Sequence, residues 1–127
     1  MSADAPLVLL VDDEPVLLRV LEVNLRVAGF DVRTAASGAG ALDAAADGPD
    51  VVVLDLGLPD MDGWEVLARL RARGAATEIP VIVLSGADRD AADDRGYAAH
   101  VHAFLTKPVE PAELVETVRG AVSRTDA

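Results

Sequence analysis

Acidic, hydroxyl and basic side chains stand at the ends of four short apolar runs in this chain. Asp12 and Asp13 follow the first of these runs, Asp55 follows the second, Ser85 follows the third, and Lys107 comes two residues after the fourth. In an open parallel α/β sheet, ligands bind outside the carboxyl ends of the strands, which meet at one edge. The sequence therefore predicts one small polar pocket that contains three carboxylates, a hydroxyl and an ammonium group.

Three carboxylates in one pocket need a cation unless one of them takes up a proton. Two unit charges about 4 Å apart repel by roughly 4 kcal/mol at an effective dielectric constant near 20. Hard oxygen ligands without a nearby histidine or cysteine favour Mg²⁺, which accepts a few carboxylates together with phosphate oxygens. With the lysine and the hydroxyl added, the pocket suits phosphoryl transfer, and one carboxylate could become an aspartyl phosphate.

Short runs rich in valine and leucine alternate with longer helical patterns five times along the chain. The expected strands are 7–11, 31–35, 51–54, 80–84 and 103–105. Runs that are apolar on both faces, such as 51–54, are typical of a parallel sheet covered by helices on both sides. Five βα units with right-handed crossovers give a three-layer α/β sandwich.

The helix signals are clearest at the helix ends. The expected helices are 15–28, 37–46, 62–73, a short one within 88–99, and one that follows Pro111. Pro15 suits a first helical turn, and Gly29 is placed to end that helix. Asp62 and Glu65 have the spacing of a capping box at the start of the third helix, which we expect to stop at Gly74.

Length, composition and charge narrow the class of protein. A chain of 127 residues is about one domain, and 51% hydrophobic residues exclude disorder of its body. The net charge of −11 argues against direct nucleic-acid binding and is typical of simple solubility. There is no cysteine, no apolar stretch of about 18 residues and no signal-peptide pattern at the N-terminus, so we expect a cytoplasmic protein without a membrane span.

Taken together, the motifs resemble the receiver domain of two-component response regulators, over about residues 6 to 122. The matching stretches are Val11-Asp12-Asp13-Glu14, the ten residues from Leu54 to Gly63, Val83-Leu84-Ser85-Gly86, and Phe104-Leu105-Thr106-Lys107-Pro108. The resemblance implies a flavodoxin-like (βα)5 fold, with a doubly wound five-stranded parallel sheet of strand order 2-1-3-4-5. It also implies that residues 1–127 form a single receiver domain.

The resemblance further implies which residues carry the chemistry. Asp55 would accept a phosphoryl group from the phosphohistidine of a sensor histidine kinase or a histidine phosphotransfer protein. Mg²⁺ would be bound by Asp13, Asp55 and the carbonyl of Gly57, while Asp12 would act largely through water. The domain would catalyse only its own phosphorylation and dephosphorylation, as a signalling phosphoacceptor rather than an enzyme.

The remaining implied roles concern the phosphoryl group and the response to it. Lys107 would pair with the phosphoryl oxygens, and its bond to Pro108 would be cis. Ser85 would donate a hydrogen bond to the phosphoryl group, and the ring of Phe104 would turn inward into the space that this hydroxyl leaves. This packing change would alter the face formed by the fourth helix, the last strand and the last helix, to which a downstream protein would bind. The implied oligomeric state is a monomer or a weak phosphorylation-dependent dimer.

Two other functions remain open at this point. The chain could be a degenerate receiver that acts as a phosphorylation-independent interaction module, or a small phosphatase with an aspartate nucleophile. Phosphatases of the haloacid dehalogenase type have an Asp-x-Asp pattern after the first strand, whereas Asp12 and Asp13 are adjacent here. The sequence also departs from the receiver pattern at His100, where a small residue is usual, so we expect an irregular end to the fourth helix.

Overall fold

Strands and helices alternate along the chain in a computed structural model that describes residues 5–72, 79–86 and 101–126. The elements are β1 (Leu7–Val11), α1 (Pro15–Val27), β2 (Asp31–Ala35), α2 (Gly38–Ala44), a short 3₁₀ helix η1 (Ala45–Asp47), β3 (Val51–Asp55), α3 (Gly63–Arg71), β4 (Val81–Ser85), β5 (Ala103–Thr106) and α5 (Pro111–Asp126). The expected fourth helix at 88–99, the expected stop at Gly74 and His100 lie outside the described residues.

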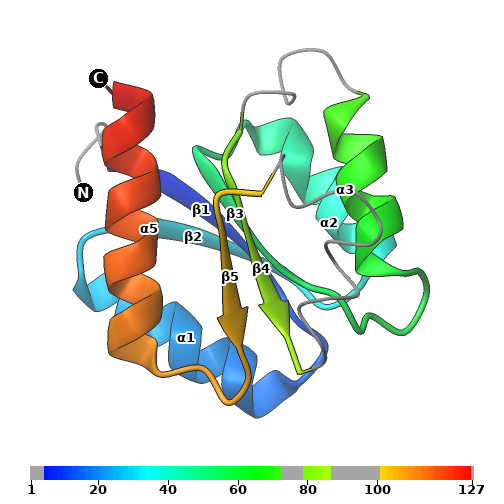
Figure 1. Ribbon diagram of the computed structural model, residues 1–127, viewed down its shortest axis with the longest axis horizontal. Coiled ribbons are helices and arrows are strands. Elements are labelled where there is room, and N and C mark those ends of the chain that lie inside the picture. Colours follow the sequence, from blue (N-terminus) through cyan, green and yellow to red (C-terminus); the bar gives the residue numbers. More distant parts are fainter. Residues whose placement is uncertain (1–4, 73–78, 87–100, 127) are drawn as a thin grey trace.

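The five strands form one parallel sheet in the order β2-β1-β3-β4-β5 (Figure 1). This confirms the predicted fold class and strand order. In the register of the sheet, Val11 lies opposite both Ala35 and Leu54, and Ser85 lies opposite Thr106. Because all strands run in one direction, their carboxyl ends gather at a single edge, where the chemistry-bearing residues were expected.

The three inner strands β1, β3 and β4 are buried on both faces, as their continuous apolar runs predict, whereas the edge strands β2 and β5 carry exposed residues. Alternate side chains along each strand point to opposite faces of the sheet. One set packs with α1 and α5, and the other set packs with α2 and α3. In β1, for example, Val8 and Leu10 belong to the first layer, and Leu9 and Val11 to the second. Figure 1 shows the two helix pairs on opposite sides of the sheet.

The helix starts follow the local signals in the sequence, whereas α3 ends at Arg71, two residues before the expected end, and α2 gives way to η1 after Ala44. Pro15 begins α1, and Gly29, with a φ of 103°, takes the left-handed conformation just beyond it. The Ser37 side chain caps α2 by accepting a hydrogen bond from the Gly40 N–H, and Asp62 caps α3 by accepting one from the Trp64 N–H. The helix expected after Pro111 is α5, which begins at Pro111 itself and buries Leu114, Val118, Ala121 and Val122.

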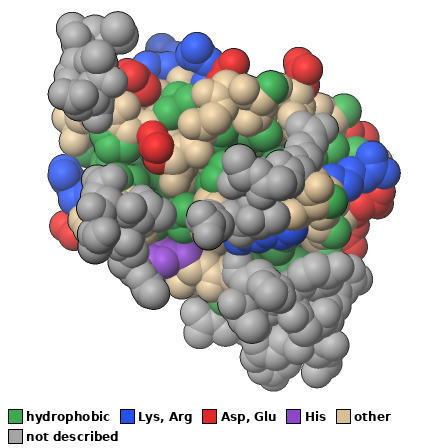
Figure 2. All heavy atoms as spheres, turned by 90° about the horizontal axis from the view of Figure 1, so that it is seen from above, with side chains coloured by type: hydrophobic (Ala, Val, Ile, Leu, Met, Phe, Trp, Pro, Cys, Tyr) green, Lys and Arg blue, Asp and Glu red, His purple; other side chains and the backbone are tan. Residues whose placement is uncertain are grey.

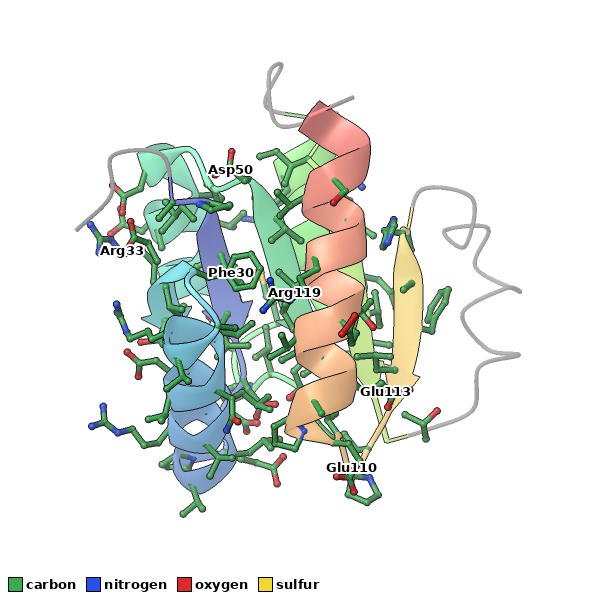
Figure 3. All side chains as sticks on the ribbon, turned by 90° about the vertical axis from the view of Figure 1, so that its left-hand side faces the viewer. Phe30, Arg33, Asp50, Glu110, Glu113 and Arg119 are labelled. Carbon is green, nitrogen blue, oxygen red and sulfur yellow. The ribbon has the colours of Figure 1, made fainter. Side chains whose placement is uncertain are left out.

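Helix α5 is tied to the end of α1 by one arginine. The Arg119 guanidinium lies 5.8 Å from the centre of the Phe30 ring, and it reaches the Ala28 carbonyl oxygen at 3.5 Å (Figure 3). Phe30 begins the chain's turn into β2 and is itself buried in the layer between the sheet and these two helices. The contact therefore joins two segments that are 91 residues apart in the sequence.

Three strands, β3, β4 and β5, end one residue later than predicted, and β4 begins at Val81 rather than at 80. Two of the later ends concern the site. β3 includes Asp55 and β4 includes Ser85, although both residues were expected just after their strands. The sheet ladder continues because the Leu56 N–H donates to the Leu84 carbonyl at 3.2 Å and the Lys107 N–H donates to the Ser85 carbonyl at 2.9 Å. Asp55 and Ser85 are therefore held by the rigid sheet itself.

The loop between β3 and α3 closes on itself at a glycine. The Gly63 N–H donates to the Leu56 carbonyl at 3.1 Å. A Cβ at Gly63 would lie 2.6 Å from the Leu56 Cα and 2.9 Å from the Asp55 carbonyl oxygen, so no side chain fits there. Gly57, by contrast, has open space where its Cβ would stand. The missing side chain at position 63 thus lets the loop return directly beside the end of β3.

The part of the chain that the structure describes contains no helix with both the length and the apolar character needed to cross a bilayer.

We predict that Gly63→Ala destabilises the protein by about 1–3 kcal/mol, since the new methyl group would push against backbone that cannot move away cheaply. Gly57→Ala is the matched control, because the same methyl group meets nothing there and should change the free energy of unfolding by less than about 1 kcal/mol. Urea denaturation of the two variants measures the difference. Equal stabilities of the two variants would contradict this account of the loop.

Candidate functional site

Three carboxylates meet at the carboxyl edge of the sheet, as the sequence predicts. Asp12 and Asp13 follow β1, and Asp55 ends β3. One oxygen atom from each of the three lies within 4.8 Å of the others. Asp12 is fully buried and Asp55 is 4% exposed, whereas Asp13 faces solvent. The cluster is therefore closed on the protein side and open on one side to an incoming ion or ligand.

Lys107 reaches into this cluster from the loop after β5. Its Nζ lies 3.1 Å from Oδ2 of Asp12 and 3.4 Å from Oδ1 of Asp55. It is nearest to Oε2 of Glu14, at 2.7 Å. The peptide bond between Lys107 and Pro108 is cis, as the receiver resemblance implied. Sequence reasoning brought Lys107 to the site correctly, but it gave no role to Glu14, whose contact spans loops 93 residues apart.

The Asp12 side chain is fixed on one side and incompletely satisfied on the other. Its Oδ1 accepts a hydrogen bond from the Glu14 N–H at 2.9 Å. Its Oδ2 is buried and has the ion pair with Lys107 but no aligned hydrogen bond among the described residues. A buried carboxylate oxygen in this state is what a metal ion or a metal-bound water would complete. The donor set of carboxylate oxygens without histidine or cysteine fits Mg²⁺.

The electrostatics of the pocket are unbalanced toward negative charge. Burial raises the pKa of the Asp55 carboxyl, the Gly57 N–H lowers it, the charge of Asp12 raises it and Lys107 lowers it, with a net rise. Burial by itself lowers the pKa of the Lys107 ammonium, but the hydrogen bond to Glu14, the close contact with Asp12 and the charges of Asp12 and Asp55 raise it above its ordinary value. Lys107 is thus firmly protonated, and burial, with the charge of Asp12, disfavours the charged form of the Asp55 carboxyl.

The loop that leaves Asp55 is fastened at two points. The Gly57 N–H donates to Oδ1 of Asp55 at 3.2 Å, so the loop begins by turning back over the carboxylate. Further along, Oδ1 and Oδ2 of Asp60 accept hydrogen bonds from the N–H groups of Gly38 (2.7 Å) and Ala39 (3.0 Å) at the start of α2. These bonds lower the pKa of the Asp60 carboxyl. Asp60 belongs to the quoted receiver motif, but only the structure reveals what it fastens.

Ser85 and Phe104 lie on neighbouring strands at this edge. Ser85 is the buried last residue of β4, and Phe104 in β5 lies opposite Val83, two residues before Ser85. Side chains alternate along a strand, so Ser85 and Phe104 belong to the same face of the sheet. The Phe104 ring is half-buried, and its centre lies 6.4 Å from that of Trp64 in α3, with the planes tilted by 55°. The two residues therefore share one face of adjacent strands, and the expected coupling between them stays a prediction.

The chain matches the family model of the response regulator receiver domain over residues 8–119. Among curated proteins it is 48% identical over 122 residues to the transcriptional regulatory protein KdpE of Mycobacterium tuberculosis (strain CDC 1551 / Oshkosh), and it is 35% identical over 122 residues to the DNA-binding dual master transcriptional regulator RpaA of Synechocystis sp.. These matches cover 95% of this chain and 53% and 51% of the two relatives. The chain therefore spans about half the length of the curated relatives it matches.

Solved structures agree with this assignment. The chemotaxis protein CheY4 of Vibrio cholerae superposes with a TM-score of 0.85 at 29% identity, covering 92% of this chain and 98% of that one. A CheY-like receiver domain protein from Methanospirillum hungatei JF-1 superposes with a TM-score of 0.84 at 25% identity, covering 97% and 98%. The sheet order, the acidic cluster with its lysine and the match over 112 consecutive positions, 8–119, lead to one conclusion. The chain belongs to the receiver domains of the response regulators of two-component signal transduction.

Proposed function

We propose that Asp55 is the phosphoacceptor of this receiver and that its phosphorylation, supported by Mg²⁺, switches the protein between two signalling states. The observation that carries the proposal is the close approach of the buried Asp55 to Asp12, Asp13 and Lys107. The Lys107 Nζ is 3.4 Å from an Asp55 oxygen. A carboxylate of raised pKa beside a protonated lysine is suited to accept a phosphoryl group, because the ammonium can neutralise the charge of that group.

Asp13 and Asp55 would hold the Mg²⁺ directly, together with the Gly57 carbonyl, and Asp12 would act through a water molecule. The buried, unsatisfied Oδ2 of Asp12 supports this assignment. When bound, the ion supplies positive charge for the phosphoryl oxygens and holds them in place. The exposed side of the cluster at Asp13 leaves room for the waters that Mg²⁺ retains.

The transfer step uses the side chains of the pocket in distinct roles. An oxygen of the Asp55 carboxylate attacks the phosphorus of a phosphohistidine on the donor protein. The new P–O bond forms as the P–N bond breaks, and the electron pair of the P–N bond stays on the histidine nitrogen. Lys107 pairs with the phosphoryl oxygens, and the Ser85 hydroxyl donates a hydrogen bond to one of them. Movement of Ser85 toward the phosphoryl group would then open space for the Phe104 ring, which connects the site to the β5 side of the molecule.

The donor would be a sensor histidine kinase or a histidine phosphotransfer protein that docks beside the site. An apolar groove of about 640 Å³ adjoins the acidic cluster and is lined by Asp13, Glu14, Pro15, Val16, Leu17, Val20, Val109 and Pro111. The side of α1 next to this groove carries exposed valines at intervals of four, three and four residues: Val16, Val20, Val23 and Val27. This spacing forms one stripe along the helix, which is the pattern that a partner helix packs against lengthwise.

The charge of this domain supports a protein partner rather than a nucleic-acid partner. On the face that Figure 2 shows, the acidic and basic side chains of the described residues are interspersed. The sequence carries 22 acidic against 11 basic residues. DNA binding by the longer relatives, as in the printed description of RpaA, would then reside outside the span matched here.

We predict that the protein gains one phosphoryl group when it is incubated with Mg²⁺ and a small phosphodonor such as phosphoramidate, whereas Asp55→Ala gains none. Intact mass spectrometry measures the gain, and Lys107→Ala should reduce the rate of labelling by at least tenfold because the ammonium no longer neutralises the phosphoryl oxygens. Absence of labelling in the native chain would favour the phosphorylation-independent interaction module. Continuous hydrolysis of a phosphate ester would instead favour a phosphatase.

We predict that Val20→Asp slows phosphotransfer from a histidine kinase or phosphotransfer domain that labels the native chain by about tenfold or more, because a charge replaces an apolar contact in the groove. Labelling by phosphoramidate should stay within about twofold of native, since that donor needs no groove. Ala68→Asp is the control, because it introduces the same charge at an exposed position of α3, across the sheet. Equal effects of the two substitutions on protein-to-protein transfer would contradict docking in the groove.

We predict that Asp55→Asn makes the Mg²⁺-free protein more stable at pH 7. The native fold raises the pKa of Asp55, so the folded state holds this proton more tightly than the unfolded chain and loses stability as pH rises above the ordinary value of 3.8. The gain in free energy of unfolding should shrink as pH falls toward 3.8 and also when Mg²⁺ is added to the native protein. Urea denaturation across this pH range tests it, and a less stable Asp55→Asn variant at pH 7 would refute the prediction.

A further inference from the structure

We infer that Glu14 is a positioning residue that holds Lys107 in a resting position, and that this ion pair must open for the ammonium to serve a phosphoryl group on Asp55. The inference rests on the proposed function, since it assigns a regulatory role to a residue at the mouth of the same site. Its basis is the order of contacts around one nitrogen atom in the unphosphorylated protein.

Glu14 is the nearest of the three carboxylates that surround the Lys107 ammonium. The distance from Nζ is 2.7 Å to Oε2 of Glu14, 3.1 Å to Oδ2 of Asp12 and 3.4 Å to Oδ1 of Asp55. An ammonium group has three N–H donors, so three carboxylates are as many partners as it can hold at once. In the resting protein, Lys107 therefore lies closest to the residue that takes no part in the chemistry, and furthest from the residue that would be phosphorylated.

The backbone around Glu14 directs its side chain to this contact. Glu14 is the N-cap residue of α1, a position where side chains often accept a hydrogen bond from the helix, but its carboxylate makes no such bond. Its N–H instead donates to Oδ1 of Asp12 at 2.9 Å, which fixes the backbone beside the acidic cluster. The carboxylate is thereby left to reach across to the loop after β5 and to meet Lys107 there.

Exposure determines which of the three contacts gives way. A phosphoryl group on Asp55 adds strongly charged acceptor oxygens, so Lys107 must give up one of its present partners to bind them. Asp12 is fully buried, and water could not replace a lost contact there. The Glu14 side chain is 58% exposed and would be solvated on release, so its contact is the least costly to break. Glu14 therefore competes with the phosphoryl group for the lysine.

The same residue also faces the docking groove. Glu14 lines the groove together with Val16 and Val20 of α1 and Val109 of the loop after β5. A donor protein that occupies this groove would therefore contact the carboxylate that restrains Lys107. A small phosphodonor makes no such contact and must wait for the ion pair to open by itself. Loss of the Glu14 charge should accordingly help a small donor more than it helps a docked protein donor.

The test is the rate of labelling by phosphoramidate at saturating Mg²⁺, followed by intact mass. Glu14→Gln should label about two- to fivefold faster than the native chain, which is the factor expected when an exposed ion pair no longer opposes the step. Glu110→Gln is the matched control, because it removes the same charge from an exposed position at the start of α5 (Figure 3), and it should stay within about 1.5-fold of native. The concentration dependence should show the Glu14→Gln gain in the maximal rate rather than only in the half-saturating donor concentration.

A Glu14→Gln rate that equals or falls below the native rate would overturn the inference, as would an equal acceleration by Glu110→Gln. A Glu14→Gln variant that lowers only the half-saturating donor concentration, with an unchanged maximal rate, would also overturn it. That outcome would show that Glu14 merely repels the anionic donor. These failures are distinct from failure of the proposed function, which requires that the native chain itself not be labelled on Asp55. Urea denaturation of Glu14→Gln verifies that the variant is folded, and Glu14→Ala provides a second removal of the ion pair with the same expected direction.

Discussion

The repulsion among carboxylates that share one buried edge of a sheet is the constraint on which the rest of this structure depends. Asp12, Asp13 and Asp55 lie within reach of a single ion, and Lys107 is the one cationic side chain within 4 Å of Asp12 or Asp55 among the described residues. The protein carries an electrostatic cost in its unliganded form that a divalent cation relieves. A site of this kind is ready to bind because its own charges are not balanced.

The fold keeps the charges together against their repulsion. Asp55 and Ser85 are last residues of fully buried strands, so the sheet holds their backbone. The loop after Asp55 closes at Gly63 and is fastened to α2 through Asp60, which limits how far the acidic cluster can spread. The apolar layers on both faces thus hold the carboxylates close together in spite of their repulsion. A bound ligand, rather than a rearrangement of the core, reduces this repulsion.

Much of this arrangement follows from sequence patterns. The uniformly apolar run 7–11 identifies β1 at its observed bounds. β2 also has its expected bounds, although Asp31, Arg33 and Thr34 interrupt its apolar pattern, and proline and capping residues mark the helix starts. Asp12, Asp13, Asp55 and Lys107 are brought together as expected, because parallel strands share one carboxyl edge. That residues 1–127 form a single domain stays a prediction.

The contacts that were not predicted join residues that are far apart in the sequence but close together in the fold. Glu14 meets Lys107 across 93 residues, and Asp60 meets Gly38 across 22. Both acids stand in motifs that the sequence made visible, but an exposed acidic residue has many alternatives, and no periodic pattern selects its partner. The strand ends at Asp55 and Ser85 were placed one residue short because a polar side chain ends an apolar run before it ends the hydrogen-bonded ladder.

The most direct test of the central claim is a crystal structure of the chain with Mg²⁺ and beryllofluoride, a mimic of the phosphoryl group. The account predicts one Mg²⁺ bound at about 2.0–2.1 Å by oxygen atoms of Asp13, Asp55 and Gly57, with the fluoride group on Asp55 and the Lys107 ammonium beside it. An acidic cluster that takes up no ion, or a beryllofluoride group attached to a different carboxylate, would contradict it.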